Sequence, residues 1–371
     1  MCIRDRPGFQ CGIDADDLPD VGYDLLVQRV TVSGVRYEGI GLRSDETTVV
    51  ESCSVTLAGG RGISAAVVRG CTVLTSGGYG VYASTVADCR VESMSMGIFA
   101  IATLNCEARS NGEQSSHHGI YAENVQNCNG YALYGNGIRA QTVSNSTGIS
   151  QYSDGLSVWR SAQNSVGEAY GATSAGISAS NAVVQGCYGW ASDGIGIHAF
   201  QVSDSVGYSQ GTASTSHGIY CLSTVTNSRG RSAGAGGGYG IYGYQIRGCT
   251  GISAGSSGIY SAGRIVADSL GETIAPSSSA HGISGAALVT GSQGRAAAYG
   301  AGHGISATQV SASYGYAYTG AGNGINATFL ATHSCGSRQS SEASRYGISA
   351  ARAVGCYASQ GENIAQKYDM P

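Results

Sequence analysis

Apolar residues recur along this chain in a short motif that begins with glycine. The glycine is followed by Ile, Val or Leu and, two positions later, by Ala or another small residue, as in GVYASTVADC (80–89) and GIYAENVQNC (119–128). Side chains two apart on a strand point to the same side, so the aliphatic and the small residue share one face and the residue between them faces outward. No 3.6-residue period accompanies the motif, and we therefore expect strands rather than helices.

The motif repeats at steps of 17 to 24 residues from Gly39 to Gly347. Each unit is too short for a helical hairpin but fits three short strands and three turns, which make one coil of a parallel β-solenoid. Like residues then stack on like residues and form ladders inside a continuous core. Because the linker before each glycine varies in length, the pattern favours a right-handed parallel β-helix with three strands per coil and about 16–17 coils.

We expect residues 12–371 to form a single β-helix domain that carries an acidic insertion at 14–24. The start of the chain (1–11) contains no apolar signal-peptide segment, and its first residues, MCIRDR, resemble the adapter-derived translations found at the beginnings of metagenomic reading frames. We therefore expect a non-native or disordered start, with the N-terminal coils and the export signal missing.

Two stretches and the chain end carry a resemblance to a known group of proteins. GISASNAVVQGCYGW (176–190), GISAARAVGCYAS (347–359) and the final QKYDMP resemble the Gly/Tyr/Cys-rich repeat proteins of environmental bacteria within the secreted, pectate lyase-like right-handed β-helix superfamily. The resemblance implies the fold and secretion. It leaves the activity open, because that superfamily includes lyases, hydrolases, epimerases, adhesins and phage spikes.

The composition of the chain argues against some classes of binding partner but says little about activity. Charged residues make up 12% of the chain and the net charge is −4, which gives no electrostatic basis for binding nucleic acid or an anionic membrane. No apolar run approaches 18 residues, so we expect no membrane insertion. The oligomeric state stays open.

Cysteine, asparagine and histidine each recur at a fixed position of the repeat. Cys and Ser alternate freely in one slot, which indicates a stacked row of small core side chains; disulfides between neighbouring coils, such as Cys53–Cys71, and metal binding are the alternatives. Asn or Asp precedes that slot and fits a left-handed turn. Histidine directly precedes the motif glycine in four coils, where a turn residue is favoured over a two-histidine site: His118, His217, His281 and His303.

Acidic residues are concentrated near the start of the chain. The stretch GIDADDLPDVGYD is a solvated loop or cap, or alternatively a weak Ca²⁺ site, although it lacks the spacing of an EF-hand. The candidate metal ligands are Asp14, Asp16, Asp17 and Asp20. No other cofactor is indicated.

Aromatic residues occupy the outward position between the aliphatic and the small residue in two sets of coils. If the register holds, they form two exposed stripes of rings about 5 Å apart, suited to the apolar faces of sugars. The alternative is a ladder that only stabilises the sheet. The stripes consist of Tyr82, Phe99 and Tyr121, and of His198, Tyr220, Tyr242 and Tyr260.

These patterns favour a non-enzymatic extracellular or cell-surface β-helix that binds polysaccharide or acts as an adhesin-like display scaffold. One alternative is a polysaccharide lyase or glycoside hydrolase whose catalytic coils lie upstream or in residues 12–51. Another is a purely structural stalk. The enzyme hypothesis predicts that acidic residues and a basic residue converge on two or three adjacent coils. The sequence does not show such a cluster. We therefore assign no catalytic residue.

Overall fold

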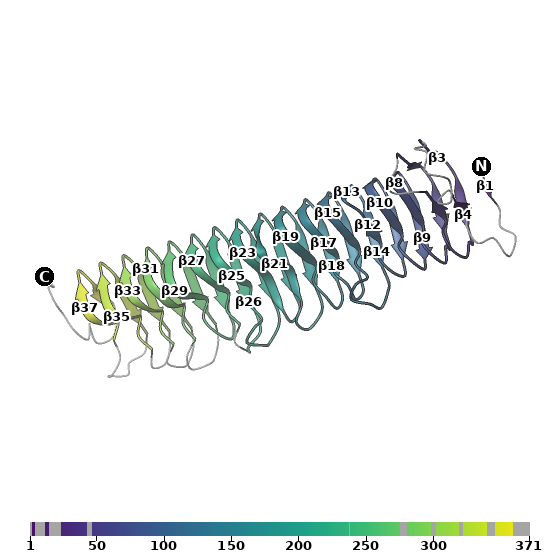
Figure 1. The fold of residues 1–371 in the computed structure, drawn as a ribbon. Helices are drawn as coiled ribbons and strands as arrows, with labels where there is room; N and C mark the ends of the chain where they lie inside the picture. The colour runs from purple at the N-terminus through teal and green to yellow at the C-terminus, as the bar shows by residue number, and fades with distance from the viewer. Residues whose placement is uncertain are drawn as a thin grey trace. The chain divides into compact units, whose positions relative to one another are not determined.

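The structure of the chain is a computed structural model that describes residues 2–3, 12–14, 24–42, 47–236, 238–274, 280–297, 302–318, 322–339 and 346–358. The chain divides into two compact units, Met1–Ser178 and Ala179–Pro371, and each is described by itself. In each unit parallel strands stack coil upon coil, which confirms the parallel β-solenoid (Figure 1). Among the described residues, no helix is long and apolar enough to cross a membrane.

The first unit contains two kinds of strand, which belong to two sheets. The short-strand sheet consists of β1 (Cys2–Ile3), β4 (Thr31–Ser33), β7 (Ser54–Thr56), β9 (Thr72–Ser76), β11 (Arg90–Ser93), β14 (Glu107–Ser110), β16 (Asn129–Ala132), β18 (Thr147–Ser150) and β20 (Val166–Ala169). The long-strand sheet consists of β2 (Ile13–Asp14), β3 (Leu26–Gln28), β5 (Ile40–Gly41), β6 (Val49–Glu51), β8 (Ile63–Arg69), β10 (Val81–Ala87), β12 (Ile98–Phe99), β13 (Ala102–Leu104), β15 (Ile120–Gln126), β17 (Ile138–Ser144) and β19 (Leu156–Gln163).

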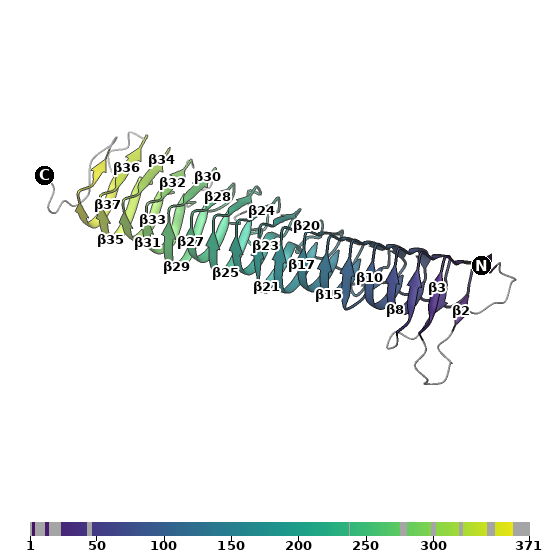
Figure 2. The same ribbon diagram turned by 90° about the horizontal axis from the view of Figure 1, so that it is seen from above.

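The second unit repeats the same two kinds of strand, seen from above in Figure 2. Its short strands are β22 (Tyr188–Ala191), β24 (Val206–Ser209), β26 (Arg229–Ser232), β28 (Thr250–Ser253), β30 (Leu270–Thr273), β32 (Gln293–Ala296), β34 (Tyr314–Ala317), β36 (Cys335–Arg338) and β38 (Tyr357–Ala358). Its long strands are β23 (Ile195–Ser203), β25 (Ile219–Thr226), β27 (Ile241–Arg247), β29 (Ile259–Ala267), β31 (Ile283–Thr290), β33 (Ile305–Ser311), β35 (Ile325–Thr332) and β37 (Ile348–Val354). Strand β21 (Ala175–Gln185) spans the division of the chain.

The three strands predicted for each coil are separate in some coils, and in most coils the first two are joined into one long strand. Three separate strands occur where β2, β3 and β4, where β5, β6 and β7, and where β12, β13 and β14 follow one another. Elsewhere the first two strands run together as one long strand. In β15, for example, alternating burial is interrupted by two consecutive exposed residues, Glu123 and Asn124, where the strand turns a corner of the coil.

The core of each coil consists of the apolar residues that the motif predicted. The aliphatic residue after the motif glycine is fully buried from Ile40 to Ile348, and the small residue two positions later is buried in most coils. Parallel register places like on like, as between Ile120 and Ile138. The stacked aliphatic and alanine ladders are therefore confirmed in both units.

Glycine at the second position of the short strands from β16 to β36 allows the two sheets to approach one another closely in these coils. A Cβ atom on Gly130 would lie 2.3 Å from the carbonyl oxygen of Gly137, and one on Gly315 would lie 2.1 Å from that of Gly324. Real Cβ atoms do not come this close to a backbone oxygen. Backbone therefore packs against backbone, and the coil interior is narrow.

The corner after each long strand requires a left-handed backbone, as the sequence predicted. Asp88, Asn105 and Asn127 have φ values of 54°, 52° and 54°. Their side chains are also linked along the stack, because Asn105 Nδ2 donates to Asp88 Oδ1 at 3.0 Å and Asn127 Nδ2 donates to Asn105 Oδ1 at 3.2 Å. The corner is thus fixed both by local conformation and by a side-chain ladder.

The cysteine slot forms a row of free thiols in which serine hydroxyls take the same position in other coils. The backbone N–H of Cys89 donates to Cys106 Sγ at 3.4 Å, and that of Cys128 donates to Ser146 Oγ at 3.1 Å. The cysteines from Cys53 to Cys356 in the described residues are free, so the predicted structural ladder is present and the alternative of a Cys53–Cys71 disulfide is not. Either side chain serves, because the slot needs a small acceptor.

Candidate functional site

The first predicted aromatic stripe is a ladder of stacked rings on the first unit. Strand register pairs Tyr82 with Phe99 and Phe99 with Tyr121. Ring centroids are 5.2 Å and 5.1 Å apart, with interplanar angles of 12° and 5°. Tyr79, from the position before the motif glycine, stacks on both Tyr82 and Phe99 at 6.0 Å.

The second stripe lies on the second unit and is built in the same way. Register pairs His198 with Tyr220, Tyr220 with Tyr242, and Tyr242 with Tyr260. Tyr242 is stacked 4.6 Å from Tyr220 and 5.4 Å from Tyr260, whereas His198 meets Tyr220 edge-on at 5.1 Å. Both sets of residues are therefore brought together as their spacing indicated.

Face-to-face stacking limits what these ladders can bind. All seven predicted residues are partly buried rather than fully exposed. Each inner ring, such as Phe99 or Tyr242, has a neighbour on both of its faces. Sugars stack on ring faces, and here mainly ring edges and hydroxyl groups remain. The geometry thus favours the stabilising role for the inner rings.

A second row of side chains lies beside these ladders, at the position directly before each motif glycine. The imidazole Nδ1 atoms of His118, His217, His281 and His303 each accept a hydrogen bond from the backbone N–H of the equivalent residue in the next coil, at 2.9–3.0 Å. Other acceptors occupy the same position in other coils: Asp154 Oδ1, Ser257 Oγ and Asn323 Oδ1. We call this row the pre-glycine ladder.

Two histidines of the pre-glycine ladder, His118 and His217, are neutral at pH 7. Burial lowers the pKa of His118 and of His217 to about 4, with smaller contributions from the charge of Arg139 and from His198, respectively. His281 and His303 stack at 5.1 Å with their rings nearly parallel, but both Nδ1 atoms already accept backbone hydrogen bonds. This leaves those nitrogens unavailable to a metal. Among the described residues, no group of three or more metal-ligating side chains could hold an ion.

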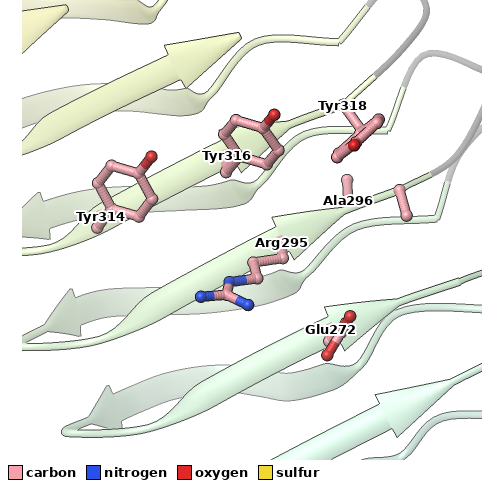
Figure 3. A pocket seen from close by; sticks show the side chains of 7 residues that line it. Glu272, Arg295, Ala296, Tyr314, Tyr316 and Tyr318 are labelled. Atoms are coloured by element: carbon pink, nitrogen blue, oxygen red, sulfur yellow. The ribbon is translucent and has the colours of Figure 1, made fainter. Parts of the chain in front are cut away.

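An open hollow on the short-strand sheet of the second unit was not predicted. It has a volume of about 300 Å³. Glu272, Arg295 and Tyr316 follow one another in register across β30, β32 and β34. Figure 3 shows Arg295 between Glu272 and the row of tyrosines. The full lining is Glu272, Arg295, Ala296, Ala297, Tyr314, Tyr316 and Tyr318.

The tyrosines of this hollow differ from those of the ladders in how their faces lie. Tyr316 and Tyr318 meet edge-on, with centroids 5.5 Å apart and an interplanar angle of 79°. Tyr318 is 49% exposed, and Tyr316 donates its hydroxyl to Gln339 Oε1 at 3.1 Å. Within the described part of the chain no ring stacks on either face-to-face, and both tyrosines line the hollow. Alternating Tyr-Gly-Tyr-Ala-Tyr (314–318) was the available signal in the sequence.

The acidic stretch near the start is only partly described. Asp14 lies exposed at the end of β2, and Asp24 accepts a hydrogen bond from the Thr47 hydroxyl. Asp16, Asp17 and Asp20 lie outside the described residues, so the Ca²⁺ hypothesis stays a prediction.

Comparison with protein-family models, with curated proteins and with solved structures found no match for this chain.

Proposed function

We propose that this protein is a non-enzymatic β-solenoid that binds polysaccharide through tyrosines on the outer face of its short-strand sheet. The observation that carries the proposal is the hollow at Tyr314, Tyr316 and Tyr318, where ring faces are open rather than stacked on one another. Flat apolar rings beside a few charged groups suit the mixed apolar and polar surface of a sugar.

Binding is favoured over hydrolysis by the residues around the hollow. Glycoside hydrolysis requires two carboxyl groups across the scissile bond. Among the described residues, Glu272 is the single carboxylate in the lining of this hollow, and Arg295 stands next to it in register. An extracellular or cell-surface location and membership of the pectate lyase-like superfamily belong to this proposal, since a polysaccharide ligand fits both.

A glycan-array experiment tests the proposal with one variant in the hollow and one in a covered ladder. Tyr316→Ala removes an open ring, and Tyr242→Ala removes a ring that is covered on both faces. We expect the unmodified protein to bind at least one polysaccharide, Tyr316→Ala to lose that binding, and Tyr242→Ala to keep it. Absence of glycan binding by the unmodified protein, or equal binding by Tyr316→Ala, would contradict the proposal.

A further inference from the structure

Two hydrogen-bond donors face one another on the first unit without an acceptor between them. His118 accepts the backbone N–H of Asn136 at its Nδ1 atom, at 3.0 Å. A neutral imidazole has one protonated nitrogen, so the proton of His118 is on Nε2. The Nε2 atom lies 3.4 Å from Nη1 of Arg139, which is also a donor. Neither group can satisfy the other.

The other contacts of the Arg139 guanidinium hold it in place but provide no negative charge. Its guanidinium carbon lies 5.7 Å from the ring centroid of Tyr121 and 5.2 Å from that of Trp159. Its Nε atom is buried and has no hydrogen-bond partner. Within the described residues Arg139 forms no ion pair. A buried donor without a partner is costly, so a missing acceptor is indicated.

A register shift in strand β19 places the exposed indole of Trp159 beside His118 and Arg139. Strands β17 and β19 pair as Ala140–Val158 and Thr142–Ser161, so β19 has one extra residue at the corner. Trp159 lies in that extra segment, is 39% exposed, and meets Tyr121 edge-on at 6.2 Å. Bulges of this kind re-aim side chains and occur frequently next to binding sites.

The geometry points to an oxyanion site at His118 and Arg139. One oxygen of a carboxylate or sulfate group accepts from His118 Nε2–H and from the Arg139 guanidinium, and Trp159 contacts whatever carries the group. The site gives an acceptor to the two donors that face one another, His118 Nε2–H and Arg139 Nη1–H, and supplies the missing negative charge. The positive charge of Arg139 also contributes to the lowered pKa of His118, and a bound anion opposes this effect. The inference does not rest on the proposed function, because the hollow is formed by other residues.

The test follows the Arg139 Nε–H and His118 Nε2–H resonances by NMR during titration with sodium acetate, sodium sulfate, sodium glucuronate and neutral glucose. Sodium chloride at equal ionic strength controls for screening. We expect acetate, sulfate and glucuronate to shift both resonances with saturation, and glucose and chloride to leave them unchanged. Tighter binding of glucuronate than of acetate assigns the site to a sugar-borne carboxylate, and equal binding assigns it to small oxyanions.

Two variants remove one donor each. His118→Asn keeps an acceptor for the Asn136 N–H, as Asn323 does for the N–H of Tyr346, but loses the Nε2 donor. Arg139→Gln removes the charge. Each weakens binding about tenfold or more. The matched control is Arg109→Gln, since Arg109 also lies over a tyrosine but its Nε already donates to Asn111 at 2.9 Å.

Unchanged Arg139 and His118 resonances in the unmodified protein would overturn the site. So would equal oxyanion binding in Arg139→Gln and in the unmodified protein. Neither result contradicts glycan binding at the hollow, because the glycan-array experiment tests Tyr316 and not Arg139.

Discussion

His217 and Tyr239 occupy the same position in consecutive coils, and the imidazole Nδ1 of His217 accepts the backbone N–H of Tyr239 at 2.9 Å. The bond requires a neutral ring. Protonation of Nδ1 replaces the acceptor with a donor and leaves a backbone N–H without a partner between two coils. Stability therefore depends on the charge of this histidine.

We predict that the free energy of unfolding falls as the pH drops from about 6.5 toward 4. Burial lowers the pKa of His118 and of His217 to about 4 in the folded protein, below the ordinary value of 6.5. Between these values the unfolded chain binds more protons, so acid favours unfolding, and this contribution is fully present above pH 6.5. Urea denaturation at a series of pH values measures the effect. A flat profile across this window would contradict it.

Substitutions at His281 distinguish two roles of the side chain: accepting a backbone hydrogen bond, and binding a proton at low pH. Asn occupies the same position at Asn323, where its Oδ1 accepts the N–H of Tyr346 at 3.1 Å. We expect His281→Asn to retain most of the stability at pH 7 and to lose part of its pH dependence. His281→Leu leaves the N–H of His303 without an acceptor and costs about 1–3 kcal/mol. Equal stability of both variants at pH 7 would show that the hydrogen bond contributes little.

The core of each coil was predictable from the sequence because identical environments recur. The ladder of Ile residues, the left-handed corner at Asn127 and the thiol row all follow from comparing equivalent positions. The acceptor role of His118 was missed, since His, Asn, Asp and Ser share no obvious property until their Nδ1, Oδ1 and Oγ atoms are seen to bind the same N–H.

Register within a coil was harder to predict than register between motif glycines. Gly285 lies two residues after Ile283, where the motif places the small inner residue, but it has a φ of 78° and Ala286 pairs with Ala307 instead. The bulge that contains Trp159 is of the same kind. The alignment of Glu272, Arg295 and Tyr316 depends on short strands in which only glycine and a small residue repeat, so the hollow was not apparent.

Glycine packing gives a third prediction. Gly315→Ala places a Cβ atom 2.1 Å from the carbonyl oxygen of Gly324, and the two sheets must separate to admit it. We expect a loss of about 3 kcal/mol or more, or failure to fold. Gly263→Ala is the control, because its Cβ meets nothing within 4 Å and only the positive φ of 82° is unfavourable. That variant costs about 1 kcal/mol, and thermal unfolding ranks the two.

The thiol row gives a fourth prediction. Cys89 is 3% exposed and its equivalents in other coils include Ser146, so Cys89→Ser changes stability by less than about 1 kcal/mol. The neighbouring thiols of Cys106 and Cys71, together with burial, raise the pKa of Cys89, which keeps it as a thiol. Iodoacetamide should therefore label it only after denaturation. Rapid labelling of the folded protein at Cys89 would contradict the buried ladder.

The contact between Gly130 and the carbonyl oxygen of Gly137 has a consequence for how such a chain can diversify. Where backbone lies against backbone, no side chain stands between the two strands, so truncating a side chain there cannot open a pocket. Duplicating a coil copies a finished interior without disturbing its neighbours, since each coil meets only the next. In this architecture a new binding site therefore forms on the outer surface, through substitutions of the exposed side chains of individual coils.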